Sequence, residues 1–360
     1  MTDRKQYVQI DTFNSYMTTT PKCGVIQGSK MSGLLYTLYV NEVTILHNLL
    51  NDKIYKDITN SDNLTLTSNI THDTFNFVDD STSIISFNKT TDIKNYLTHY
   101  YKLLHIYYTT NKLQINSDKT QLMLTYKPKH KQQLQNFHFN ANNDIIENST
   151  TLKILGYTIR HNLDMTTQIG NVCANLHHRI HNIRQLTNIT NNKTRQIFIN
   201  SLVMGKLYYA LPLYTQVTKK QLNMIHKVIM TAARAIIGSY CFKQTTNYIL
   251  TKCNMLTAKQ LITYSAILFT HKITTNKLPT SNYNKYLPPN RRATNLTIRT
   301  KIRPKSKKTK NHVVHKGAEL LNLIDNNIRI LPLNKFKKRL RSHVKENDLW
   351  DPGGGEDEDD

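Results

Sequence analysis

Cysteine is scarce in this chain of 360 residues, and the four that it contains are widely spaced. That spacing does not form the disulfide framework of small secreted proteins. Long apolar runs are absent too, since no stretch reaches the roughly 18 apolar residues of a membrane-spanning helix. The N-terminal residues MTDRKQYVQID have no apolar run of signal-peptide length. We therefore expect an intracellular protein, in the nucleus or the cytoplasm, that is not secreted and has no membrane partner.

Acidic residues are also few: 24 Asp and Glu stand against 48 Lys and Arg, which gives a formal net charge of +24. Six of the acids lie in the last ten residues, DPGGGEDEDD, so the rest of the chain is more basic still. A body this basic repels itself unless it meets a polyanion, and nucleic acid is the first partner to consider. An anionic membrane surface ranks second, because no basic amphipathic anchor is evident.

The first part of the chain alternates between helix-like and strand-like patterns. Residues 29–50 are mostly apolar and lack helix breakers after Gly33, which predicts a buried helix. The stretch FNFVDDSTSII at 75–85 predicts two short strands around an Asp-Asp turn. Helical spacing of apolar residues predicts an amphipathic helix over 93–107. Further strands are predicted at 121–126, 137–139, 144–146 and 153–159. Together these segments predict an α+β fold.

After residue 164 the apolar residues follow helical spacing almost throughout, which predicts an all-α region. One of its helices would end at Gly238, a typical C-cap residue. We predict five parts in all: an α+β part at 1–163, helices at 164–283, a basic linker or arm at 284–311, C-terminal helices at 312–350 and a disordered acidic tail at 351–360.

Four short segments stand in one order along the chain. They are GVIQGSKMSGLLYTLYVNEV from Gly24, FVDDSTSIIS from Phe77, KLQINSDKTQLMLTY from Lys112 and ILGYTI from Ile154. Each segment alone is a weak signal, because an Asp-Asp or Gln-Gly pair occurs by chance in many chains. Four such segments in this order and at this spacing are hard to obtain by accident.

This order resembles the palm of reverse transcriptases, especially those of non-LTR retrotransposons. The segments are similar to that family's Gln-Gly, Asp-Asp, Asn-x-x-Lys-Thr and Leu-Gly blocks, although Gly33 and Ile26 stand where the family often has proline. The resemblance implies a partial palm at 1–163, an antiparallel sheet with packed helices, followed by a thumb and connection region. The implied activity is RNA-directed DNA polymerisation, a nucleotidyl transfer that uses an RNA template, a DNA primer and dNTPs.

The resemblance also implies roles for individual residues. Asp79 would be a metal ligand and Asp80 its less critical neighbour, while Lys119 would lie near the triphosphate, where it would contribute charge or act as a general acid. The template and nucleotide turn would be Gln27, Gly28 and Ser29, and the primer grip would be Leu155 and Gly156. For the aspartates the alternative is an ordinary β-turn. For Lys119 the equally weighted alternative is one more lysine among many.

The physical chemistry of nucleotidyl transfer agrees with these roles. Such sites hold two divalent cations about 3.5–4 Å apart, which stabilise the attacking and the leaving oxygen. Mg²⁺, or Mn²⁺ in its place, takes carboxylate oxygens from the protein and further oxygens from the substrate phosphates. An Asp-Asp pair on a hairpin would present two carboxylates from a rigid support.

One block of the family is missing from the sequence. The family carries a further aspartate block, its first metal ligand, some distance upstream of the Gln-Gly block, but only 23 residues precede Gly24 here. The fingers are missing as well. We therefore expect a truncated element with weak or no polymerase activity alone. Two alternatives stay open: a non-catalytic nucleic-acid-binding remnant, and a subunit whose missing aspartate comes from a partner polypeptide.

The basic arm is the clearest electrostatic site. Eight cations in it would contact the nucleic-acid backbone: Arg291, Arg292, Lys301, Arg303, Lys305, Lys307, Lys308 and Lys310. Their binding would release counterions from the phosphates and would depend steeply on salt. Alternatively, the run is a nuclear-import signal.

Overall fold

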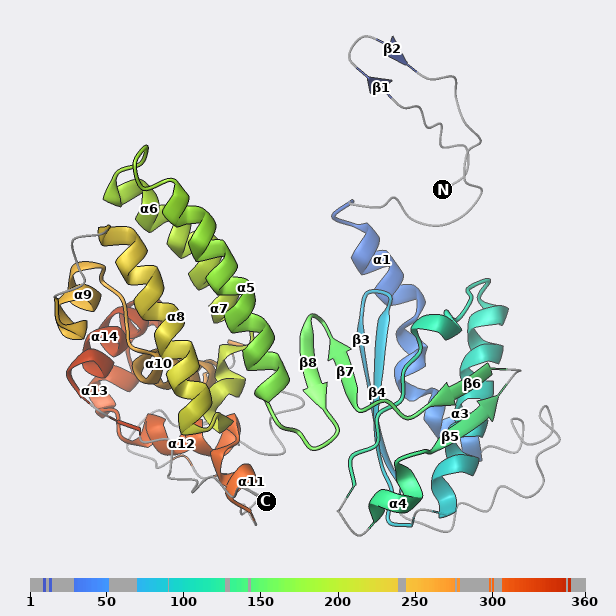
Figure 1. The fold of residues 1–360 in the computed structure, drawn as a ribbon. Helices are drawn as coiled ribbons and strands as arrows, with labels where there is room; N and C mark the ends of the chain where they lie inside the picture. Colours follow the sequence, from blue (N-terminus) through green and yellow to red (C-terminus); the bar gives the residue numbers. More distant parts are fainter. Residues whose placement is uncertain are drawn as a thin grey trace. The chain divides into compact units, whose positions relative to one another are not determined.

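The structure is a computed structural model, and Figure 1 shows its helices and small antiparallel sheets, which make it an α+β protein as predicted. It describes residues 9–10, 13–14, 29–51, 70–89, 91–126, 130–141, 144–238, 244–275, 277–278, 298, 300, 306–347 and 349–350. The chain forms two compact units, Met1–Ile154 and Leu155–Asp360. Each sheet in the described part of the chain consists of two strands.

The first unit contains most of the strands. Its elements are β1 (Gln9–Ile10), β2 (Phe13–Asn14), α1 (Ser32–Tyr39), the 3-10 helix η1 (Asn41–Asn51), β3 (Thr71–Phe77), β4 (Asp80–Ser86), α3 (Thr91–Thr110), the 3-10 turn η2 (Ser117–Lys119), α4 (Lys131–Leu134), β5 (His138–Ala141), β6 (Asp144–Glu147) and β7 (Thr151–Ile154). The strands pair in sequence order, β1 with β2, β3 with β4 and β5 with β6, always antiparallel.

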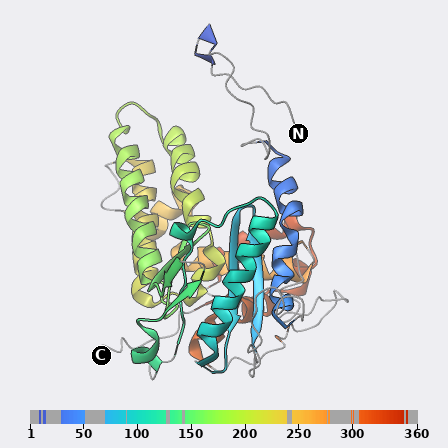
Figure 2. The ribbon, with the colours of Figure 1, turned by 90° about the vertical axis from the view of Figure 1, so that its right-hand side faces the viewer.

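Helix α3 organises this unit, because both of its sides are covered (Figure 2). On one side Tyr96 and Tyr100 share a buried cluster with Val43 of η1. On the other side Leu97 packs in a second cluster with Phe139 of β5. The predicted amphipathic helix is therefore confirmed, and it is buried on two faces instead of one.

The predicted buried helix at 29–50 is wrong in two respects. The segment divides into α1 and η1, and α1 has no buried side chain. The residues that enter the core are Val40, Val43, Leu46 and Leu50, of which the first three are spaced by three. That spacing matches the three residues per turn of a 3-10 helix, so this geometry turns all three side chains inward.

Two of the predicted strands also differ from the structure. Residues 121–126 contribute only an isolated bridge, in which Leu122 pairs with Asn148 just after β6. The single strand predicted at 153–159 is a hairpin instead, in which β7 and β8 (Tyr157–Arg160) pair across a two-residue turn.

The second unit is helical, as its apolar spacing predicts. After β8 its elements are α5 (Thr166–Gln185), α6 (Asn192–Phe198), the π-helical segment η4 (Ile199–Met204), α7 (Gly205–Tyr208), the 3-10 helix η5 (Leu211–Gln216), α8 (Lys219–Ile237), α9 (Thr246–Lys252), α10 (Ala258–Thr274), α11 (Lys307–Asn311), α12 (Val313–Asn322), α13 (Asn326–Arg329) and α14 (Leu333–Glu346). One large apolar cluster joins them.

Helix ends in this unit follow their sequence signals. Helix α8 begins with a reciprocal capping box between Thr218 and Gln221 and ends at Gly238, whose φ of +96° confirms the predicted glycine C-cap. Arg195 of α6 is buried, and it donates hydrogen bonds to the carbonyl oxygens of Ile236, Thr187 and Thr190. This buried cation ties the end of α8 to the α5–α6 turn.

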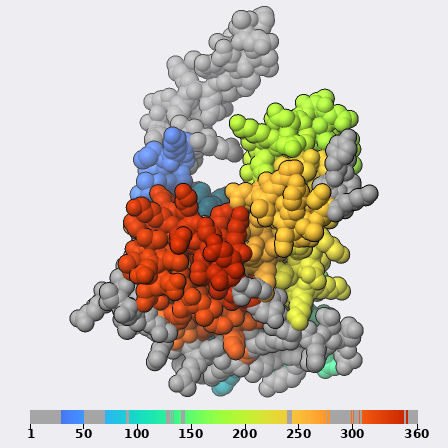
Figure 3. Space-filling model, turned by 90° about the vertical axis from the view of Figure 1, so that its left-hand side faces the viewer, coloured from blue at the N-terminus to red at the C-terminus, as the bar shows by residue number. Residues whose placement is uncertain are grey.

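Helices α12 and α14 pack against α10, and Figure 3 shows the surface that the C-terminal helices form, in orange to red, beside the preceding helices in yellow. Helix α14 buries Phe336, Leu340 and Val344 on one face. Its whole sequence, LNKFKKRLRSHVKE, carries six Lys and Arg and a single Glu. In the described ranges, no helix combines the length and the apolar character needed to cross a bilayer.

Candidate functional site

The β3–β4 hairpin carries the two predicted metal ligands at its tip. The register runs from Thr71 opposite Ser86 to Phe77 opposite Asp80. The turn therefore consists of Val78 and Asp79, while Asp80 is the first residue of β4. The predicted Asp-Asp turn is shifted by one residue, because the strand pairing extends as far as Asp80.

Val78 adopts a backbone conformation that is unusual for a β-branched residue. Its φ is +55°, in the left-handed region that a two-residue hairpin turn normally gives to glycine. Such a residue costs on the order of 1–3 kcal/mol and persists only where its surroundings hold it, most often at functional sites. The tip of this hairpin is therefore a strained turn that carries a carboxylate.

Helix α1 provides those surroundings. A Cβ built on Gly33 would lie 3.7 Å from Cγ2 of Val78, so α1 passes directly beside the turn. Burial, and then the negative charge of Asp79, raises the pKa of Tyr36 on the same helix. The structure thus brings together the Gln-Gly block, to which α1 belongs, and the Asp-Asp block.

The third block reaches the same region through the end of α3. The backbone N–H of Leu113 donates to the carbonyl oxygen of Tyr108 at 2.8 Å, and the phenol of Tyr39 donates to the carbonyl oxygen of Asn111 at 2.8 Å. Burial and neighbouring phenols raise the pKa of Tyr108 to about 12, while a hydrogen bond with Ser81 of the hairpin opposes that shift. These contacts join three of the four blocks around the end of α3.

Lys119 is the exposed last residue of η2. Asn116 caps this turn, since its Oδ1 accepts from the backbone N–H of Lys119 at 3.2 Å. Within the described residues, the Lys119 ammonium does not contact Asp79 or Asp80. A substrate phosphate would have to bridge them if all three acted together.

Both aspartate side chains are exposed, and neither forms an ion pair within the described residues. The described ranges contain no group of three or more His, Cys, Asp and Glu side chains that would hold a metal. A cation here would therefore take one or two carboxylates from Asp79 and Asp80 and its other oxygens from water and phosphates. That donor set fits Mg²⁺, which is usually bound in this way.

A buried polar network joins the β3–β4 hairpin to α3, and it was not predicted from the sequence. His72 Nδ1 lies 2.7 Å from the Tyr96 hydroxyl, and its Nε2 lies 3.1 Å from Oγ1 of Thr74. Ser83 Oγ lies 3.0 Å from the Tyr100 hydroxyl. Burial lowers the pKa of His72 to about 4, so this ring is neutral near pH 7. The alternation of His72 and Thr74 along β3 was the available signal, because residues two apart share a face.

The fourth block forms a turn, as expected for Leu155 and Gly156. These two residues connect β7 and β8, with φ values of +47° and +81°, a combination suited to a tight hairpin. The phenol of Tyr209 donates to the carbonyl oxygen of Leu155. A leucine in the left-handed region is again unusual, so this turn is held by its surroundings as well.

Several predicted residues cannot be placed. Gln27, Gly28, Arg291, Arg292, Lys301, Arg303 and Lys305 lie outside the described residues. Ser29 is described, and its Oγ accepts from the backbone N–H of Met31 at 3.3 Å in the turn before α1. Lys307, Lys308 and Lys310 belong to α11, so the last part of the predicted arm is helical, and Lys310 is exposed.

Comparisons of the chain with protein-family models, with curated proteins and with solved structures each found no match.

Proposed function

We propose that the first unit is part of a polymerase palm of the reverse transcriptase type, and that Asp79 and Asp80 bind its divalent cation. The observation that carries this proposal is the packing of Gly33 against Val78. That contact joins two sequence blocks that resemble neighbouring parts of such a palm. Strain at a turn that presents a carboxylate supports the same reading, because strained residues gather at active sites.

The residues divide the work by their chemistry. Asp79 and Asp80 supply hard oxygen ligands for Mg²⁺ or Mn²⁺, which would activate the attacking oxygen and stabilise the leaving one. The hairpin presents these carboxylates at its tip, and the buried His72–Tyr96 bond anchors the other end of β3 to α3. Lys119, on its capped turn, is free to meet a triphosphate.

The expected activity of this chain alone is weak or nil. The described residues contain no group of three or more His, Cys, Asp and Glu side chains that would hold a metal, so Asp79 and Asp80 lack a third protein ligand among them. A partner polypeptide would then complete the site. The second candidate function is non-catalytic binding of nucleic acid, which the net charge of +24 favours.

The test is primer extension on poly(rA) primed with oligo(dT), in Mg²⁺ and in Mn²⁺. It would compare the native chain with Asp79→Asn and with Asp118→Asn, an exposed carboxylate on η2 that serves as the matched control. Binding of Mn²⁺, followed by electron paramagnetic resonance, reports on the metal site without turnover.

We expect Asp79→Asn to weaken Mn²⁺ binding and to abolish any extension, while Asp118→Asn leaves both unchanged. Equal Mn²⁺ binding by all three proteins would refute the metal role. Absence of extension, together with salt-sensitive RNA binding in all three proteins, would favour the non-catalytic function.

A further inference from the structure

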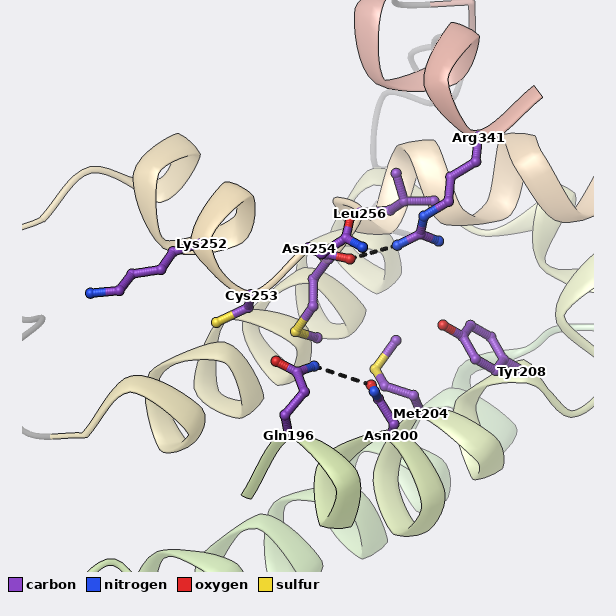
Figure 4. A pocket seen from close by; sticks show the side chains of 10 residues that line it. Gln196, Asn200, Met204, Tyr208, Lys252, Cys253, Asn254, Leu256 and Arg341 are labelled. Atoms are coloured by element: carbon purple, nitrogen blue, oxygen red, sulfur yellow. Dashed lines mark hydrogen bonds between the residues drawn. The ribbon is translucent and has the colours of Figure 1, made fainter. Parts of the chain in front are cut away.

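The helical unit contains a cavity of about 400 Å³ that none of the four sequence blocks touches (Figure 4). Its walls come from the α6–η4 segment, α7, the turn between α9 and α10, and α14. The volume lies within the roughly 300–1,000 Å³ of ordinary ligand sites. The residues that matter most for its chemistry are Asn200, Tyr208, Asn254, Met255 and Arg341.

The cationic side of the cavity is fixed by one turn. The Arg341 guanidinium donates to the carbonyl oxygen of Asn254 at 2.6 Å, and Lys345 Nζ donates to Asn254 Oδ1 at 2.8 Å. Asn254 itself has a φ of +49°, a conformation that Asn tolerates better than most residues. Arg341 is thus held in position before any ligand arrives.

The residues that line the cavity include no carboxylate, so none of them neutralises the charges of Arg341 and Lys345. Burial and then the charge of Arg341 lower the pKa of Lys345, so the two groups repel each other. Arg341 makes no second hydrogen bond within the described residues, which leaves donors available. Lys252 does not add to this pair, because its Nζ lies 5.6 Å from the ring of Tyr248, away from the cavity.

The opposite side of the cavity is aromatic and apolar. Tyr208 is 46% exposed, and its ring faces the space below Arg341 (Figure 4). Burial raises the pKa of Tyr208, and the charge of Arg341 opposes that shift. Met204 and Met255 form a buried floor. The amides of Gln196 and Asn200, joined at 3.3 Å, add donors and acceptors at the rim.

We infer that this cavity binds one nucleotide unit of a single-stranded nucleic acid. Arg341 would pair with the phosphate, the base would stack on Tyr208 above the methionine floor, and the amides would meet the base edge. Cations beside an exposed aromatic ring are the usual elements of such sites. The choice of nucleic acid as ligand class rests on the proposed function, whereas the anion preference rests on the geometry alone.

The test is the fluorescence anisotropy of a labelled RNA of about 12 nucleotides, bound by the full chain between about 50 and 200 mM salt. Tyr208→Ala should weaken binding by about 5-fold to 100-fold without changing the salt slope. Tyr208→Phe keeps the ring and should bind like the native chain. If Tyr208→Ala binds as tightly as Tyr208→Phe, the inference is wrong.

A second pair of variants tests the phosphate contact. Arg341→Gln should weaken binding and reduce the salt slope by about 0.7. Arg339→Gln removes the same charge from an exposed position of α14, and Lys345→Gln removes the other bond to Asn254. Both controls should lose less affinity than Arg341→Gln. Equal losses in all three would overturn the phosphate contact and leave only a diffuse basic surface, and thermal unfolding would exclude misfolding.

Competition identifies the source of the nucleotide. If UMP displaces the RNA from the native chain, the cavity takes free nucleotides as well; if it does not, the cavity requires a strand. Either result supports the inference only when Tyr208→Ala binds RNA more weakly than the native chain. Mn²⁺ binding tests the other unit, so equal Mn²⁺ binding by the native chain and Asp79→Asn, with an intact Tyr208 effect, would remove the polymerase proposal and keep this one.

Discussion

Val78 and Gly33 lie against each other at the tip of the β3–β4 hairpin, with 3.7 Å between Cγ2 of Val78 and the position that a Gly33 Cβ would take. A methyl group at that distance makes an ordinary van der Waals contact. The size of the side chain at position 33 is therefore a means of testing how α1 and the strained turn depend on each other. This relationship gives the first prediction.

Gly33→Ala is expected to leave stability unchanged or slightly raised, whereas Gly33→Leu should lower it by about 1–3 kcal/mol through overpacking. Displacement of Val78 by the leucine should also weaken Mn²⁺ binding at Asp79. Chemical denaturation and Mn²⁺ titration of both variants measure these effects. Equal behaviour of the two variants would show that α1 does not hold the turn.

His72 predicts a loss of stability in acid. Burial lowers its pKa to about 4 in the folded protein, against 6.5 for an ordinary histidine. The unfolded chain therefore binds a proton first as pH falls. Protonation of His72 therefore does not affect the free energy of unfolding above pH 6.5. Between about pH 6.5 and pH 4 it lowers that free energy by up to about 1.4 kcal/mol per pH unit. His72→Gln should flatten this part of the stability profile; an unchanged profile would contradict the prediction.

Gly317 predicts a steric limit between α10 and α12. A Cβ at this position would overlap Oγ1 of Thr270 and lie 3.1 Å from the carbonyl oxygen of Ala266. Gly317→Ala should therefore destabilise the helical unit by about 1–3 kcal/mol. Gly170→Ala on α5 is the control, because nothing lies within 4 Å of its Cβ and the helix should gain about 0.5–1 kcal/mol. Thermal unfolding of both variants decides.

Arg195 predicts a cost of removing a buried cation. Its guanidinium satisfies carbonyl oxygens at the end of α8 and in the α5–α6 turn. Arg195→Met would leave these acceptors without their donor, which costs about 1–3 kcal/mol for each group that water does not reach. Arg184→Met removes a similar charge from an exposed site of α5 and should be nearly neutral. Similar unfolding midpoints for the two variants would show that water replaces Arg195.

The sequence predicts the fold class, the helix α3, the β3–β4 hairpin and the capped end of α8, because each has a local periodicity or a local cap. It does not predict that Asp80 belongs to a strand. That depends on how far Phe77 and its partner extend their pairing, which the positive φ of Val78 permits. Nor does it predict the contact of His72 with Tyr96, since the two residues meet only after α3 has packed on the hairpin.

The functional residues likewise divide into those that a local sequence pattern predicts and those that only tertiary packing brings together. Block order alone selected Asp79, Asp80 and Lys119, since each belongs to a short local pattern. The cavity beside Arg341 has no such pattern, because its walls come from three separate parts of the chain, residues 196–208, residues 252–256 and Arg341. Only tertiary packing brings these parts together.

The charge distribution of α14 gives salt two opposite effects on this protein. Its six basic residues repel one another, with a single glutamate to offset them, along a helix that buries Phe336, Leu340 and Val344. Added salt screens that repulsion and should raise the melting temperature of the helical unit, although it weakens the binding of a polyanion. A nucleic acid would stabilise the helix as salt does, and it would also add its own binding free energy. The positive charge of α14 would thus govern both the stability of the helical unit and its affinity for a polyanion.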